Sequence, residues 1–174
     1  MATRPITVDD AEELHALILA SREHLAPYEP ERTTEFFTVA GQRRIIEGHL
    51  AMFDAGRMVP LVITDDAGRL AGRINLDNIV RGAFQSVYLG YWVGAGFLRQ
   101  GLASAAVGDA LHWAFVSLGL HRVQADVRVG NTASLAVLAK HGFIEYGRPE
   151  RYLFLDGDWR DCLCHQLLSD DWHP

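Results

Sequence analysis

The sequence has little that would suit a membrane, a disulfide framework or a metal site. No apolar run in its 174 residues is long enough to cross a bilayer, and residues 1–10 lack the apolar core of a signal peptide. Its only two cysteines, Cys162 and Cys164, are too close in sequence for an easy disulfide, and its eight histidines show no zinc-like spacing. We therefore expect a reduced, cytoplasmic protein that binds neither a metal nor a membrane.

Basic residues are also in the minority. The chain has 16 Lys and Arg against 22 Asp and Glu, which gives a net charge of −6. This balance argues against nucleic-acid binding through a general basic surface. A negative field favours cationic acceptors such as amines, although only weakly at physiological salt. The composition, 49% hydrophobic and 22% charged, and the lack of a repeat or linker predict one domain over residues 1–174.

Hydrophobic patterns place helices and antiparallel strands first, and alternating strands and helices after them. We expect strands at 4–8, 61–64, 70–76, 86–93, 122–129 and 143–146, and a final hairpin of 151–155 with 159–168. Helices are expected after Asp9 or Asp10 and over 31–54, 102–118 and 132–140, with a stiff connector at 25–30 and a turn at 78–82. This order predicts an α/β (α+β) fold, a mixed, mostly antiparallel sheet flanked by helices.

The stretch 88–118 combines a strand, a glycine-rich turn and an amphipathic helix. Aromatic and β-branched residues fill 86–93, and Gly94, Gly96 and Gly101 interrupt the strand. From Leu102 onward, apolar residues recur at helical spacing. The first N–H groups of such a helix lack intrahelical partners, and the helix dipole adds positive charge there, so the turn suits a phosphate group.

Two phosphate-binding motifs overlap in this turn. Residues 94–99 imitate the dinucleotide motif GxGxxG, but arginine replaces the third glycine and no repeated strand–helix units precede it. Residues 98–103, LRQGLA, resemble the Q/R-x-x-G-x-G/A pyrophosphate loop of the GCN5-related N-acetyltransferases (GNAT), which bind acetyl-CoA. The match holds at Gly101 and Ala103 and departs at Leu98. On its own, the loop is equally well explained as an ordinary turn.

Further segments extend the resemblance to nearly the whole chain. Residues 131–134, NTAS, match a second GNAT signature, N-x-x-S, which is followed by a helix and Gly142-Phe143. Segments 25–30, 78–84 and 155–161 and the closing 171–172 resemble the RimJ/RimL-type branch, RimJ most closely, which acetylates protein N-termini. The resemblance implies the acetyltransferase fold, acetyl-CoA as the donor and an amine as the acceptor.

The resemblance also implies roles for individual residues. The acetyl-CoA contacts that it implies are Trp92, Val93, Leu98, Arg99, Gln100, Gly101, Leu102, Ala103, Ser104, Asn131 and Ser134. Ser134 is the expected proton donor to the leaving thiolate, and a backbone N–H near Val93 is the expected donor to the thioester oxygen. Asn131 also fits a simple role as a helix cap, and Ser134 could bond only to its own backbone.

The acceptor side is less well defined. The resemblance implies acceptor contacts from Tyr28, Asn75, Arg81 and Phe84, although the aromatic residues also suit a core and Arg81 a surface. Some RimL-like enzymes have a glutamate base where this chain has Leu153. The general base is therefore open among Glu29, Asp77 and Glu150.

These features favour an acetyltransferase that acts on a protein N-terminus, typically a ribosomal protein beginning with alanine. Two alternatives remain. One is acetylation of a small amine such as an antibiotic, a polyamine or an amino acid conjugate. The other is a non-catalytic acyl-CoA-binding protein of ribosome assembly. We expect a monomer or a homodimer with no direct contact to nucleic acid.

Overall fold

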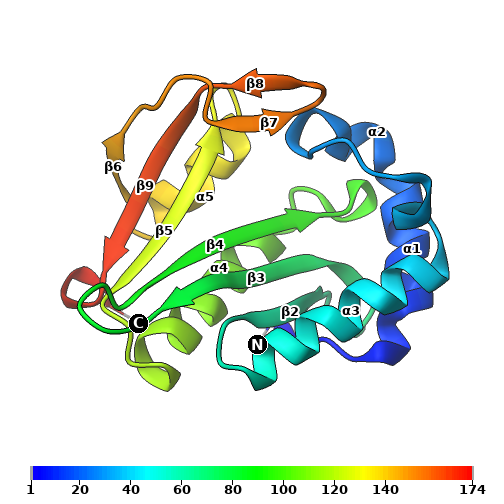
Figure 1. Cartoon of the computed structure of the whole chain (residues 1–174), viewed down its shortest axis with the longest axis horizontal. Helices are drawn as coiled ribbons and strands as arrows, with labels where there is room; N and C mark the ends of the chain where they lie inside the picture. The colour runs from blue at the N-terminus through cyan, green and yellow to red at the C-terminus, as the bar shows by residue number, and fades with distance from the viewer. Residues whose placement is uncertain (1, 174) are drawn as a thin grey trace.

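The computed structural model describes residues 2–173, and a seven-stranded sheet runs through it (Figure 1). The strand order is β1–β2–β3–β4–β5–β9–β6, and within residues 2–173 every neighbouring pair is antiparallel except β4 and β5. The strands are β1 Thr3–Pro5, β2 Val59–Thr64, β3 Leu70–Val80, β4 Ser86–Val93, β5 Arg122–Arg128, β6 Ile144–Gly147 and β9 Cys162–Leu168. The predicted mixed, mostly antiparallel sheet is confirmed.

Helices cover both faces of this sheet. On one face lie α1 Ala11–Ala20 and α3 Val39–Asp54, and on the other lie α4 Leu102–His112 and α5 Thr132–Lys140. Shorter helical segments are η1 Val8–Asp10, α2 Arg22–Leu25, η2 Ala26–Tyr28, η3 Thr34–Phe37, η4 Ala95–Phe97, the π-helical η5 Trp113–Ser117 and η6 Ser169–Asp171. Among residues 2–173, no helix has the length and apolar character needed to cross a membrane.

The near-continuous apolar sequence of β2 follows from its position between two helical layers. Leu61 and Ile63 pack in the cluster that contains α4, whereas Val62 packs in the cluster that contains α1 and α3. All three side chains are fully buried. Because both faces of this strand are covered, alternation between polar and apolar residues is absent there.

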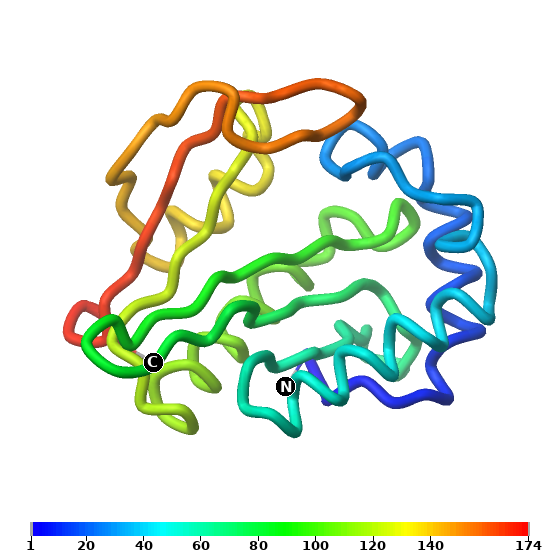
Figure 2. The backbone as a smooth tube through the Cα atoms, in the orientation of Figure 1, coloured from blue at the N-terminus to red at the C-terminus, as the bar shows by residue number. Residues whose placement is uncertain are grey.

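The two central strands, β4 and β5, separate along their length (Figure 2). They pair in parallel only where Ser86–Tyr88 lies beside Arg122–Gln124. Beyond Tyr88, the far edge of β4 has no strand beside it in the described chain. Gly94 N–H donates to the Ala71 carbonyl of β3 at 2.8 Å. Since amide directions alternate along a strand, the N–H of Val93 points away from β3, toward the gap.

Several expected element boundaries were wrong, two of them because strands pair differently from the sequence pattern. The turn expected at 78–82 begins later, because β3 continues to Val80, which pairs with Ser86 across a bulge. The long last strand expected at 159–168 is broken at Asp161. Strands β7 Leu153–Leu155 and β8 Asp158–Arg160 form a separate two-stranded sheet around the predicted Asp-Gly turn. The connector at 25–30 is largely helical, formed by the end of α2 and by η2.

Candidate active site

Two cavities meet at the gap between β4 and β5. The first, of about 190 Å³, extends along the side of the sheet that carries α4 and α5. Six of the residues predicted to contact acetyl-CoA line it: Trp92, Val93, Leu98, Ala103, Asn131 and Ser134. We call this space the donor cavity. Its lining comes from α2 and η2, the unpaired end of β4, and the N-terminal parts of α4 and α5, so segments far apart in the sequence form one wall.

The second space, of about 300 Å³, is called here the acceptor cavity. It shares Tyr28, Tyr91, Trp92, Asn131 and Ser134 with the donor cavity. It adds charged and polar side chains from the segment after η2 and from the sheet: Glu29, Arg32, Arg73, Asn75, Asp126 and Arg128. The predicted acceptor contacts Tyr28 and Asn75 therefore lie here. Ser134 is reached from both sides, which is the arrangement that transfer between two substrates requires.

Ser134 is held at this junction by two contacts. The Asn131 side chain accepts a hydrogen bond from the Ser134 backbone N–H at 3.2 Å, so the predicted cap of α5 is confirmed. The Tyr91 hydroxyl lies 2.9 Å from Ser134 Oγ. Burial raises the pKa of Tyr91, so its phenol stays protonated at neutral pH and can donate to Ser134. The serine hydroxyl is then free to donate its own proton into the cavity.

The turn before α4 has the backbone shape that the sequence motif implied. Gly101 is the N-cap of α4 with φ 77°, in the left-handed region. His141 Nε2 lies 2.8 Å from the Ser104 carbonyl, and burial lowers the pKa of His141, so its neutral ring donates this bond. This contact holds the first turn of α4 to the end of α5. Gln100, Gly101 and Leu102 border a separate cavity beside the 65–68 turn.

The wall of the acceptor cavity is built by η2, which contacts two other elements. Asp156 N–H, at the tip of the β7–β8 hairpin, donates to the Glu29 carbonyl at 3.0 Å, and Arg128 Nη1 donates to the Pro27 carbonyl. A third cavity, of about 270 Å³, adjoins this wall, and Leu25, Glu29, Pro30 and Arg32 line it as well as the acceptor cavity.

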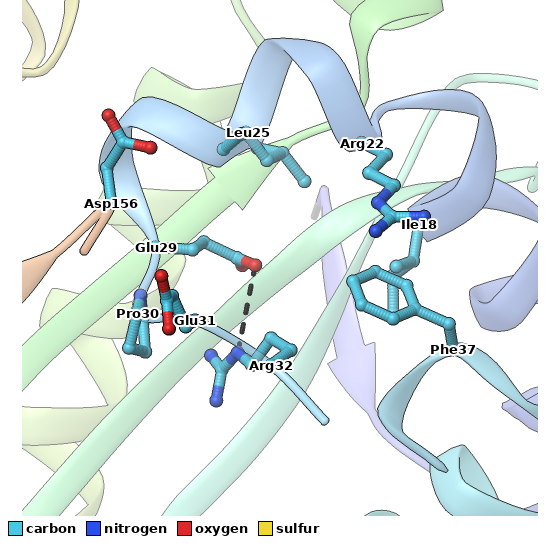
Figure 3. Close-up of a pocket in the computed structure, with 10 residues that line it drawn as sticks. Ile18, Arg22, Leu25, Glu29, Pro30, Glu31, Arg32, Phe37 and Asp156 are labelled. Atoms are coloured by element: carbon cyan, nitrogen blue, oxygen red, sulfur yellow. Dashed lines mark ion pairs between the residues drawn. The ribbon is translucent and has the colours of Figure 1, made fainter. Parts of the chain in front are cut away.

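Glu29 lies at the boundary between these two spaces. Its carboxylate faces Arg32, with Oε2 3.8 Å from Arg32 Nε (Figure 3). Burial nevertheless raises the pKa of Glu29, with Arg32 and Arg73 acting in the opposite direction. A carboxylate with a raised pKa at a cavity wall is a candidate general base. Of the three carboxylates left open by the sequence, Glu29 is the one that lines the acceptor cavity.

Other sequence candidates lie elsewhere. Arg81 and Phe84 are in the β3–β4 connection and line none of the three cavities at the site, and Arg81 Nη1 donates to the Leu118 carbonyl at 2.7 Å. Burial raises the pKa of Asp77, yet this residue does not line the acceptor cavity either. Leu153, where related enzymes have a glutamate, does line the acceptor cavity and adds only apolar surface.

Three residues of the site were missed from the sequence. Tyr91 holds Ser134, Arg73 is buried at the cavity wall, and Asp126 has a buried Oδ1 without a hydrogen-bond partner in the described part of the chain. A signal was available for Arg73, since it is the one charged residue in the mostly apolar run Leu70–Leu76. Such an isolated charge on a central strand usually has a specific partner or role.

A family model described as an acetyltransferase (GNAT) domain matches residues 2–144. The chain belongs to this family. It is thus a GNAT acetyltransferase, and the alternative of a dinucleotide-binding fold is excluded by its mostly antiparallel sheet. Proteins of this family use acetyl-CoA.

Relatives narrow the branch of the family. The chain is 32% identical over 167 residues to the probable N-acetyltransferase YjcK of Bacillus subtilis, covering 95% of this chain and 91% of the relative. It is 30% identical to the ribosomal protein uS5-alanine N-acetyltransferase of Escherichia coli, covering 95% and 86%. The solved structure of Mycobacterium smegmatis RimJ in complex with CoA-disulfide matches with a TM-score of 0.93 at 37% identity, covering 97% and 82%. The chain is therefore RimJ-like.

Proposed function

We propose that this enzyme transfers the acetyl group of acetyl-CoA to the N-terminal amine of a protein, typically a ribosomal protein beginning with alanine. The observation that carries the proposal is the meeting of the donor and acceptor cavities at Ser134. Relatives named for acetylation of ribosomal protein uS5 support the choice of acceptor.

The residues around the donor cavity fit acetyl-CoA. The N-terminus of α4 offers backbone N–H groups for the pyrophosphate, and the left-handed Gly101 shapes the turn that exposes them. The cavity beyond this turn is lined largely by apolar side chains such as Leu98, Ala103 and Val137, which suits a pantetheine arm. Acetyl-CoA, when bound, supplies the activated acyl group.

The chain's own groups then account for the proton transfers. An α-amine has a pKa of about 8 and is mostly protonated at neutral pH. Glu29 accepts that proton, directly or through water, from an amine in the acceptor cavity. The N–H of Val93 points into the gap and stabilises the negative charge that develops on the thioester oxygen. Ser134, oriented by Tyr91, donates a proton to the leaving thiolate, and the second proton that the nitrogen loses as the amide forms restores the serine hydroxyl.

A small amine is the second candidate acceptor. The contacts of η2 with Arg128 and Asp156 bridge the acceptor cavity and favour a compact substrate. The third cavity favours a peptide instead, because it continues from Glu29 and Arg32 and gives room to residues after the first (Figure 3). We give this continuity more weight, since a single small amine would leave the third cavity unused.

The test offers acetyl-CoA together with an alanine-starting peptide or with a panel of small amines. Release of free thiol reports turnover, and mass spectrometry identifies the acetylated atom. The same peptide with a blocked N-terminus is the control. We expect acetylation of the free N-terminus and none of the blocked peptide. Faster turnover of a small amine than of every peptide offered would contradict the protein acceptor.

A further inference from the structure

Arg73 is a buried cation without an anionic partner. Its residue is 7% exposed and lies in the middle of β3. The charges of Asp77 and Glu29 act on the guanidinium, yet it forms no ion pair in the described part of the chain. Removing a charge from water without a paired counter-ion is strongly unfavourable. A buried, unpaired cation at a cavity wall is suited to bind an anionic group of the substrate.

Its orientation is fixed from one side by His49 of α3. Arg73 Nη2 lies 2.6 Å from His49 Nδ1 and 3.5 Å from Asn75 Oδ1. Burial and the neighbouring Arg73 lower the pKa of His49 to about 4, so the imidazole is neutral at pH 7 and accepts the bond. Nε has no partner within residues 2–173, and no hydrogen bond engages Nη1 there. The guanidinium is therefore held in place with donors to spare.

The surroundings distinguish Arg73 from the other arginines of the acceptor cavity. Arg128 already donates to the Pro27 carbonyl, and Arg32 lies beside Glu29. Three guanidinium groups thus face two carboxylates, Glu29 and Asp126, around one cavity. A polycationic acceptor such as a polyamine would add further positive charge to a space that already has an excess of it. An acceptor with an anionic group would balance that excess.

We propose that Arg73 binds a carboxylate of the acceptor, so that the enzyme prefers amines carrying a carboxylate a few bonds from the reacting nitrogen. This inference rests on the proposed function only in that an amine is acetylated at the junction of the two cavities. A planar guanidinium with free donors matches a carboxylate in geometry as well as in charge. The carboxylate has two possible sources, an acidic second residue of a peptide or the free α-carboxylate of an amino acid.

Two matched pairs of acceptors separate these sources. The first pair is an Ala-Glu peptide and its Ala-Gln isostere, both amidated at the C-terminus, and the second is alanine and alaninamide. In the pair that represents the true source of the carboxylate, we expect kcat/KM to be roughly 10- to 100-fold higher for the acceptor with the carboxylate than for its amide. The difference should lie mainly in KM, as is typical of a hydrogen bond to a charged group. A lysine-containing peptide and spermidine should be the poorest acceptors.

The Arg73→Gln variant tests the assignment to this residue. It should lose the preference within each pair while still binding acetyl-CoA, whereas the exposed control Arg43→Gln should behave as the parent. If Arg73→Gln does not fold, the proposal is tested by Arg73→Lys and by the kcat/KM ratios of the parent enzyme within each acceptor pair. Equal rates within both pairs, or a preference that survives in Arg73→Gln, would overturn the proposal. Preference for alanine over alaninamide with no peptide turnover would contradict the protein acceptor and leave Arg73 supported.

Discussion

Replacement of Gly101 by valine tests the donor side of the site most directly. Gly101 has φ 77° and ψ −1°, a conformation that a β-branched residue adopts only under strain of about 1–3 kcal/mol. A Cβ built on this residue has no protein atom within 4 Å. The free protein should therefore fold with a melting temperature lowered by several degrees, at roughly 2–4 °C per kcal/mol for a chain of this size.

The effect on the ligand should be larger than the effect on the fold. The space beside the missing Cβ is open in the free protein, and it lies at the N-cap, where phosphate oxygens would approach the backbone N–H groups. A valine side chain placed there would hold the pyrophosphate away from these groups. Loss of one charge-assisted hydrogen bond corresponds to about 1.5–3 kcal/mol, or roughly 10- to 150-fold in Kd for acetyl-CoA.

A matched control separates strain from ligand contact. Gly56, which follows α3, has φ 68° and likewise has no protein atom within 4 Å of a built Cβ. It lies in the connection from α3 to β2, whereas Gly101 caps the N-terminus of α4. Gly56→Val should thus lower the melting temperature by a similar amount and leave acetyl-CoA binding unchanged. Calorimetric titration gives Kd for acetyl-CoA, and thermal unfolding gives the melting temperature, of both variants. If folded Gly101→Val binds acetyl-CoA as tightly as the parent, the pyrophosphate lies elsewhere.

Three further predictions concern proton transfer and pH. Ser134→Ala should lower kcat at saturating acetyl-CoA at least tenfold while Kd for acetyl-CoA changes little, and an unchanged kcat would remove Ser134 from the chemical step. Glu29→Gln should abolish the rise of kcat with pH that the raised pKa of Glu29 produces, whereas Asp126→Asn should keep that rise; the reverse outcome would make Asp126 the base. The low pKa of His49, about 4 against 6.5 in the unfolded chain, means that the unfolded state binds a proton first as pH falls. The free energy of unfolding should therefore not depend on His49 above pH 6.5 and should fall as the pH is lowered from about 6.5 to about 4. An imidazole of His49 that titrates near 6.5 by NMR in the folded protein would contradict this prediction.

Local signals in the sequence correctly predicted the limits of the helix and the strand beside the donor cavity. Helix α5 begins after Asn131 and ends at Lys140, as expected from its cap and its following glycine. Strand β4 matches its expected limits at Ser86 and Val93, because aromatic and β-branched residues mark a strand on their own. The residues that line the donor cavity come mostly from these elements and from the turn that joins β4 to α4.

The acceptor side depends on contacts that no local pattern reports. Arg73 and His49 are 24 positions apart and meet only because α3 packs on β2, the neighbour of β3 in the sheet. Asp161 separates β8 from β9, although the alternation of residues through this region reads as one strand. Arg81 resembles a family position but lies at the opposite end of β4 from the cavities, since the β3–β4 connection turns there. Two of the four predicted acceptor residues, Tyr28 and Asn75, line the cavities at the site, as do six of the eleven predicted donor residues.

The net charge of the chain did not predict the charge around the acceptor cavity. The net charge of −6 suggested a cationic acceptor, yet the acceptor cavity has more guanidinium groups than carboxylates. At physiological salt, exposed charges are screened beyond about 8 Å, so the distant acidic surface contributes little inside the cavity. Arg73, which is buried and has no paired counter-ion in the described chain, is screened far less. We therefore propose that the net charge of the chain affects how a substrate approaches, whereas the arginines of the cavity select the acceptor amine.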